Sequence, residues 1–187
     1  ALDILKQYYG YSSFREGQEE IIKEILNEIC LAHKPVIVAG GGVIQGNASL
    51  ELIEFAKLLN IPVVNTMMAL GSFPYYEENY LGMVGIFGSY SANQTLRESD
   101  LILSVGARFN DRITCCFPDG ELKRKFIQID INENEISRII PAYLSVCGNA
   151  KSILSDLICE FKNGGYIQNP EQTIWLKRAI DFKSQNR

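Results

Sequence analysis

The sequence predicts an α/β domain built on a parallel sheet. The run Leu101–Val105 is mostly apolar and too short for a helix, which is typical of a strand buried on both faces. Pro35–Ala39 is a similar run, and a glycine turn at 40–42 and an amphipathic helical pattern over 48–60 follow it. A strand, a glycine turn and a helix form the start of a βαβ unit with a right-handed crossover, so the next strand is expected to be parallel.

The beginning of the chain contains a helical pattern. Ser12 and Ser13 can cap a helix, and apolar residues then recur at the spacing of one helix face. These residues are Ile21, Ile22, Ile25, Leu26 and Ile29. We therefore expect one amphipathic helix before the first strand.

The remaining elements continue the alternation of strands and helices. A second strand is expected at 62–65, an irregular glycine-containing loop at 66–87, and a helix at 89–99 that leads into Leu101–Val105. The later part of the chain predicts strands at 125–131 and Leu144–Cys147 and helices at 150–162 and 170–183.

Composition and charge narrow the class of protein. The 187 residues suffice for one domain with a core, or for a domain plus an appendage. The net charge of −4 argues against a nucleic-acid binder, and no apolar run approaches the roughly 20 residues that a membrane span needs. No secretory leader opens the sequence, so we expect a cytoplasmic protein. The lone His33 predicts no metal site, and the odd number of cysteines predicts reduced thiols: Cys30, Cys115, Cys116, Cys147 and Cys159.

A candidate anion site follows the strand Leu101–Val105. Gly106 interrupts the apolar run, and Arg108, Asp111 and Arg112 come directly after it. Open α/β sheets bind ligands at the carboxyl ends of their strands, and two guanidinium groups beside a glycine suit a phosphate. The alternative is a structural ion pair between Arg108 and Asp111, and the sequence leaves both interpretations open.

Two further strand ends have the same ambiguity. Gly40, Gly41 and Gly42 can let the backbone approach a phosphate, or they can form a tight turn without a ligand. Asp130 follows a predicted strand, where a carboxylate either binds a ribose hydroxyl or caps the next turn.

The first residues resemble the extreme N-terminus of RecQ-type DNA helicases. The resemblance rests on a helix and on Phe14, Arg15, Gly17 and Gln18, which follow the pattern Phe-Arg-x-Gly-Gln. No phosphate-binding loop G-x-x-x-x-G-K-[ST] occurs in the chain. Up to Ile29 the segment holds six acidic residues against three basic ones, which is no DNA-binding face. We therefore expect no helicase activity, and we interpret residues 1–30 as a fused helical segment.

From about residue 31 onward, the chain resembles the central domain of the acetolactate synthase large subunit. The resemblance rests on KPVIVAGGGV (34–43), IPVVNTMMALGSFP (61–74), LGMVGIFGSYSAN (81–93), SDLILSVGARFNDR (99–112), IQIDINENEI (127–136) and GNAK (148–151). It implies a three-layer Rossmann-like fold, with a mostly parallel six-stranded sheet and helices on both faces. It also implies a flavoprotein-type domain that holds FAD in an extended form, without a redox role in the main reaction.

The resemblance also implies which residues bind the cofactor. The two FAD-binding stretches would be 87–108 and 130–149, with Arg108 and Arg112 near the phosphates or the flavin and Asp130 near the adenosine. The full set of implied cofactor-binding residues is Gly40, Gly41, Gly42, Thr66, Met67, Phe87, Gly88, Gly106, Arg108, Arg112, Asp130, Ile131 and Asn149. No catalytic residue is implied in this part of the enzyme.

Three positions depart from the family pattern. Phe87 stands where the family has a histidine beside the flavin. Asn132 and Asn149 stand where the family has aspartates. Each change removes a charge or a hydrogen-bond donor, so we expect FAD affinity to be reduced or lost.

The resemblance implies three segments and a division of labour. They are the helicase-like helical segment 1–30, the synthase-like α/β domain 31–165 and a C-terminal linker helix within 166–187. In the parent enzymes of branched-chain amino-acid synthesis, thiamine diphosphate and magnesium bind to other domains and drive the decarboxylative condensation of 2-oxo acids. We therefore expect a cofactor-binding module that is inactive alone and compatible with a homo-oligomer. The alternatives are a flavin-free scaffold in a chimera and one subunit of a split synthase.

Overall fold

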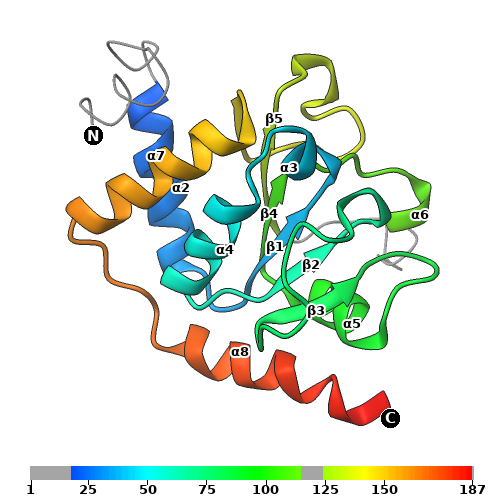
Figure 1. Ribbon diagram of the computed structural model, residues 1–187. Coiled ribbons are helices and arrows are strands. Elements are labelled where there is room, and N and C mark those ends of the chain that lie inside the picture. The colour runs from blue at the N-terminus through cyan, green and yellow to red at the C-terminus, as the bar shows by residue number, and fades with distance from the viewer. Residues whose placement is uncertain (1–17, 115–123, 187) are drawn as a thin grey trace.

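The computed structural model describes residues 18–114 and 124–186 of the chain. They form one six-stranded parallel sheet with helices on both faces (Figure 1). The strand order across the sheet is β3-β2-β1-β4-β5-β6. The strands are β1 Pro35–Ala39, β2 Val63–Asn65, β3 Tyr80–Met83, β4 Leu101–Val105, β5 Lys125–Asp130 and β6 Leu144–Cys147. The predicted three-layer α/β fold is confirmed.

The two central strands, β1 and β4, pair along their whole length, from Pro35 opposite Leu101 to Ala39 opposite Val105. From β1 the chain builds outward to β2 and β3, and from β4 it builds outward in the opposite direction to β5 and β6. The loops that follow β1 and β4 therefore diverge, and they leave a crevice at the carboxyl edge of the sheet.

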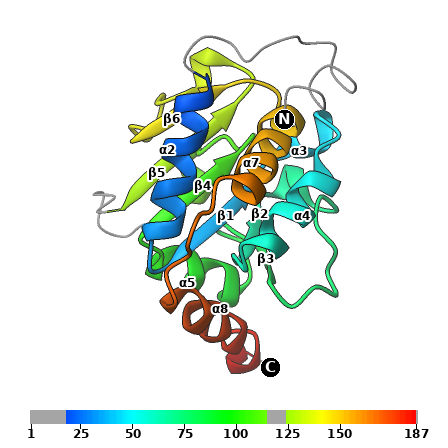
Figure 2. The same ribbon diagram turned by 90° about the vertical axis from the view of Figure 1, so that its left-hand side faces the viewer.

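Alternate residues of each central strand enter two separate cores. Ile37 and Leu103 belong to a core covered by α2 Gln18–Leu31, α4 Ser49–Leu58 and α7 Ala150–Asn163. Figure 2 shows α2 and α7 side by side across this face. On the other face, Val38 and Ile102 pack with residues of α5 Tyr90–Glu98 and α8 Glu171–Asp181. Because both faces of these strands are buried, their sequences are continuous apolar runs.

Helix α2 confirms the helix predicted near the beginning of the chain. Ile22, Ile25, Leu26 and Ile29 are buried in the core with α7 and the sheet. At the helix surface, the carboxylate of Glu28 pairs with the ammonium group of Lys125 on β5 and accepts a hydrogen bond of 3.1 Å from the Tyr143 hydroxyl. Helix α2 is therefore an integral part of this core. Residues 1–17, which hold most of the helicase-like motif, lie outside the described residues.

Helix α8 packs firmly at the end of the described chain. Trp175 is buried, and its indole N–H donates to the carbonyl of Pro35 at 2.9 Å. The amide of Gln172 donates to the carbonyls of Ile29 and Ala32 at 2.6 and 2.9 Å. These bonds tie the predicted C-terminal helix to the end of α2 and the start of β1.

The prediction of an irregular loop over 66–87 was wrong. This segment contains the 3₁₀ turn η1 Met67–Ala69 and the edge strand β3 Tyr80–Met83. The strand escaped sequence analysis because it is short, only partly buried, and interrupted by Gly82, whose φ is +102°. Its position is fixed by polar contacts that have no sequence pattern, such as the 2.9 Å hydrogen bond from the Tyr80 hydroxyl to Asn65.

Four more short elements were not predicted, and each has three to five residues. They are α3 Gly41–Gln45, α6 Asp111–Thr114, η2 Glu133–Glu135 and η3 Ser184–Asn186. Such elements are too short to show a periodic apolar pattern. Helices α4, α5, α7 and α8 agree with their predicted ranges to within two residues, whereas the predicted cap of the first helix at Ser12 and Ser13 lies outside the described residues. None of the described helices has the length and apolar character to cross a membrane, and the described cysteines Cys30, Cys147 and Cys159 are free thiols.

Asp156 is an ionisable side chain buried between α7 and α2. The amide of Gln18 lies 3.5 Å from its carboxylate, and burial raises the pKa of Asp156 from 3.8 to about 6. Because the folded chain binds this proton more tightly than the unfolded chain, the Asp156 contribution to the free energy of unfolding falls as the pH rises between these two values.

We expect Asp156→Asn to stabilise the protein most at alkaline pH. The amide removes the buried charge, so the free energy of unfolding at pH 8 should rise by about 1 kcal/mol. Near pH 3, below the pKa of both states, the carboxyl is mostly protonated whether the chain is folded or unfolded, so the variant and the parent should differ little. Thermal unfolding at both pH values measures this, with Glu24→Gln on the exposed side of α2 as the control. An equal shift at both pH values would contradict the prediction.

Candidate functional site

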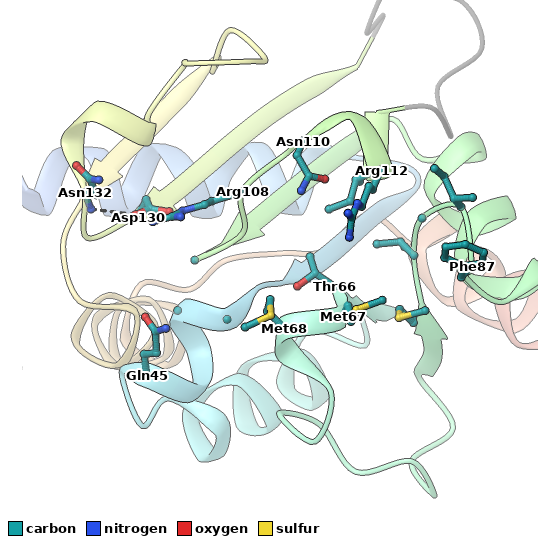
Figure 3. A pocket seen from close by; sticks show the side chains of 18 of the residues that line it. Gln45, Thr66, Met67, Met68, Phe87, Arg108, Asn110, Arg112, Asp130 and Asn132 are labelled. Atoms are coloured by element: carbon teal, nitrogen blue, oxygen red, sulfur yellow. Dashed lines mark hydrogen bonds between the residues drawn. The ribbon is translucent and has the colours of Figure 1, made fainter.

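A cleft of about 550 Å³ opens at the carboxyl edge of the sheet, where the loops after β1 and β4 diverge (Figure 3). It is lined by residues from the loops that follow β1 to β5. The lining consists of Gly41, Gly42, Gln45, Thr66, Met67, Met68, Met83, Val84, Gly85, Ile86, Phe87, Gly106, Arg108, Asn110, Arg112, Ile113, Asp130, Ile131 and Asn132.

Three glycines join the two halves of the sheet at the base of the cleft. The backbone N–H of Gly40 donates to the carbonyl of Val105 at 2.9 Å, and that of Gly42 donates to the carbonyl of Gly106 at 3.0 Å. A Cβ on Gly40 would lie 2.0 Å from the Gly106 oxygen. Gly106 itself has a φ of +57°. Gly40 therefore serves the close backbone contact and does not line the cleft, whereas Gly41, Gly42 and Gly106 do.

The loop after β2 forms an apolar wall. The N–H of Thr66 donates to the carbonyl of Ala39 at 2.9 Å, which holds the start of this loop against β1. Met67 and Met68 follow in the 3₁₀ turn η1, and both thioether side chains are largely exposed at the cleft. Figure 3 shows Thr66, Met67 and Met68 along the same side of the opening. Sequence analysis selected Thr66 and Met67 but missed Met68.

The loop after β3 forms a second apolar rim of the cleft. Two hydrogen bonds join Gly85 to the side chain of Asn93 on α5. The N–H of Gly85 donates to the amide oxygen of Asn93 at 3.0 Å, and the amide nitrogen of Asn93 donates to the carbonyl of Gly85 at 2.9 Å. The next two side chains, Ile86 and Phe87, protrude, and Phe87 is 80% exposed. Gly88 does not line the cleft, since its role is local: a Cβ there would lie 2.5 Å from the Met83 oxygen.

The loop after β4 brings positive charge to the cleft. Arg108 and Arg112 both line it, together with Asn110 (Figure 3). The expected alternative, an Arg108–Asp111 ion pair, is wrong: Arg108 pairs with Glu135, with 3.5 Å between Nε and Oε1. The Asp111 carboxylate accepts a hydrogen bond from the N–H of Arg112 at 3.0 Å, at the start of α6.

The end of β5 completes the cleft. Asp130 is buried, and its carboxylate accepts a hydrogen bond from the N–H of Asn132 at 2.9 Å. It therefore caps this turn, as the second interpretation of Asp130 predicted, while it also lines the cleft. Ile131 lies beside it and is exposed.

Asn149 lines a smaller adjoining cavity of about 110 Å³. Its side-chain oxygen accepts a hydrogen bond from the N–H of Lys151 at 2.9 Å and caps α7. The predicted residues thus lie together at one edge of the sheet. Gly40 and Gly88 do not line the cleft, because each is needed for a close contact with neighbouring backbone.

Most of the residues that sequence analysis missed are neighbours of predicted ones. Ile86, Gly85 and Val84 precede Phe87, and Asn110 lies between the two arginines. Their proximity to predicted residues was the only signal that marked them. Ile113 follows Arg112 in the same way, whereas Gln45 and Met83 have no predicted residue beside them in the sequence.

The chemistry of the lining favours binding over catalysis. Two guanidinium groups, amide side chains and a broad apolar rim suit a ligand that has an anionic part and a flat apolar part. Among the described lining residues, Asp130 carries the one carboxylate, and it is engaged in the turn.

The sheet topology and the cleft together define a Rossmann-like α/β domain with its binding crevice at the topological switch point. Residues 22–157 match the family described as "Thiamine pyrophosphate enzyme, central domain". The chain belongs to this family. The match begins within α2, in agreement with the packing of that helix into the core.

Relatives of the chain are acetolactate synthases. It is 34% identical over 176 residues to the acetolactate synthase large subunit of Haemophilus influenzae, and the aligned segment covers 94% of the chain and 31% of that protein. It is 35% identical over 175 residues to an acetolactate synthase of Mycobacterium avium, covering 94% and 28%. It is 39% identical over 162 residues to a probable acetolactate synthase large subunit of Methanococcus aeolicus, covering 87% and 26%. The chain thus spans less than a third of the length of these relatives.

Proposed function

We propose that this chain is the cofactor-binding central domain of an acetolactate synthase-like enzyme and that its cleft binds FAD. The observation that carries the proposal is the joint presence of two guanidinium groups and an apolar rim in a cleft at the switch point of the sheet. The names of the relatives support the class of enzyme. The reaction that we propose for the whole enzyme is the decarboxylative condensation of 2-oxo acids.

The residues of the cleft fit an extended dinucleotide. Arg108 and Arg112 would hold the diphosphate, because guanidinium groups bind phosphate oxygens through paired N–H groups. The thioethers of Met67 and Met68 and the exposed ring of Phe87 would contact a flat aromatic ring. When bound, FAD would supply this ring system and its flavin chemistry, which the family resemblance places outside the main reaction.

We further propose that the central domain supports the catalysis without performing it. The family name implies thiamine diphosphate with a divalent metal, and we assign both to other domains of such an enzyme. The described cleft offers arginine, amide and apolar groups, which suit a dinucleotide better than a metal-bound diphosphate that needs carboxylate ligands. Association of copies through this domain and the absence of nucleic-acid binding stay predictions, as does the fused origin of residues 1–30.

The test is a titration of the purified chain with FAD, followed by flavin fluorescence and calorimetry. We expect saturable binding that Arg108→Ala weakens by about 10-fold, since a hydrogen bond to a charged group contributes on the order of 1.5 kcal/mol. The control is Lys162→Ala on α7, which removes the same charge from an exposed pair with Glu54. It should bind FAD as the parent does.

Two outcomes would contradict the proposal. A folded chain without saturable FAD binding would identify a flavin-free scaffold. Equal weakening by Arg108→Ala and Lys162→Ala would show a general effect of net charge and no site at the cleft.

A further inference from the structure

Glu135 is an acidic residue beside a cleft that is otherwise suited to an anion. It is the last residue of the 3₁₀ turn η2, in the loop between β5 and β6. Its side chain is only 14% exposed, and its two carboxylate oxygens contact two different arginines. Oε1 lies 3.5 Å from Nε of Arg108, and Oε2 accepts a hydrogen bond of 2.9 Å from Nε of Arg138.

The loop that carries Glu135 is fixed by a buried side chain of the sheet. The Gln128 amide on β5 donates to the carbonyl of Glu135 at 2.9 Å and accepts from the N–H of Ser137 at 2.9 Å. Ser137 has a φ of +57°, and its hydroxyl accepts a hydrogen bond from the N–H of Ala142 at 3.0 Å. The backbone on both sides of the Glu135 side chain is therefore held to the sheet.

Arg108 needs such support because it is 69% exposed along its side chain. A long flexible side chain loses rotamer freedom when it binds a ligand, and a prior contact reduces that cost. The contact with Glu135 involves Nε, so it leaves the two terminal amino groups of the guanidinium for a ligand. In Figure 3, Arg108 extends from the end of β4 toward the end of β5, the side on which the Glu135 loop begins.

The charge of Glu135 is balanced within the same cluster. Arg138 forms the shorter contact with the carboxylate, so Glu135 and Arg138 together carry no net charge beside the cleft. The positive charge of Arg108 is then left for an anion, whereas an unbalanced carboxylate at this position would repel one.

We propose that Glu135 is the positioning residue for Arg108, with Arg138 as its counter-ion and Gln128 as the anchor of its loop. This inference rests on the proposed function, because it assigns Glu135 a role in FAD binding. Glu135 contacts no ligand in this scheme. It acts only by holding Arg108 in the orientation that binds the anionic part of FAD.

The experiment is a double-mutant cycle on FAD affinity, measured by fluorescence titration. We expect Glu135→Ala to weaken FAD binding by about 3- to 10-fold in the parent and to have no effect when Arg108 is already alanine. Glu135→Gln keeps the volume and an acceptor for Arg138, so it should weaken binding less than Glu135→Ala does. Glu133→Ala in the same 3₁₀ turn removes an equal charge and should leave the affinity unchanged. Cooperative thermal unfolding of each variant shows that it is folded.

Each other outcome overturns a defined part of the inference. Tighter FAD binding by Glu135→Ala would show that the carboxylate repels the ligand. An equal loss in the parent and in the Arg108→Ala background would show a structural role of the loop. If the parent binds FAD and Arg108→Ala weakens it while Glu135→Ala does not, only the positioning role fails. If the folded parent binds no FAD, the proposed function and this inference fail together.

Discussion

Gly40→Ala is expected to lower the free energy of unfolding by about 3–5 kcal/mol, which corresponds to a fall of about 10 °C in the melting temperature. The added Cβ would lie 2.0 Å from the oxygen of Gly106 and 2.2 Å from Cα of Ala107. Both contacts are with backbone, so no side-chain rotation can relieve them. The two central loops would have to separate, with loss of the hydrogen bond from Gly40 to Val105. Differential scanning calorimetry measures the effect.

Gly71→Ala is the matched control for this substitution. Gly71 has a φ of +91°, and a Cβ there would meet nothing within 4 Å. Alanine at this position adds conformational strain alone, which costs about 1–2 kcal/mol. If the two variants lost the same stability, the contact between the loops after β1 and β4 would not be a determinant of the fold.

Leu26→Ala is expected to cost about 2–5 kcal/mol, the usual range for a fully buried leucine. Leu26 lies on the buried face of α2 within the core that this helix shares with α7 and the sheet. The matched control is Leu31→Ala at the end of the same helix, where the side chain is 69% exposed and the expected change is below about 0.5 kcal/mol. Urea denaturation at constant pH measures both.

The Leu26 result also bears on the origin of the first residues. A large loss of stability would make α2 part of the domain, as its packing and the start of the family match at residue 22 indicate. A variant as stable as the parent would instead mean that α2 is an appendage, as expected for a fused segment with a boundary near residue 30.

The central elements were predictable because burial on two faces leaves a strong sequence pattern. The strands β1, β4 and β6 have their predicted bounds, and α2, α4, α5, α7 and α8 follow apolar residues at helical spacing. The edge strand β3 was missed because it is short and only partly buried, and because it is held by a hydrogen bond from its own Tyr80 to Asn65 of β2, which depends on the fold. Local patterns cannot show such a contact.

The location of the candidate site could be predicted from the sequence, but the contacts between its side chains could be predicted less well. Gly106, Arg108 and Asp130 follow strands, and parallel topology brings the carboxyl ends of strands to one edge. The partner of Arg108 was misjudged because Asp111 is close in the sequence, whereas Glu135 reaches it from the loop after another strand. Gly40 was assigned to a ligand because a glycine needed for contact with Gly106 looks the same in the sequence as one that faces a phosphate.

The backbone contact between Gly40 and Gly106 has a consequence for how the protein acquires its binding site. These two glycines belong to opposite halves of the sheet and lie far apart in the chain, so their contact forms only when β1 and β4 have paired. The cleft is built on this contact. A ligand that binds there therefore recognises only molecules in which both halves have docked, and it draws partly assembled chains toward the native state by mass action.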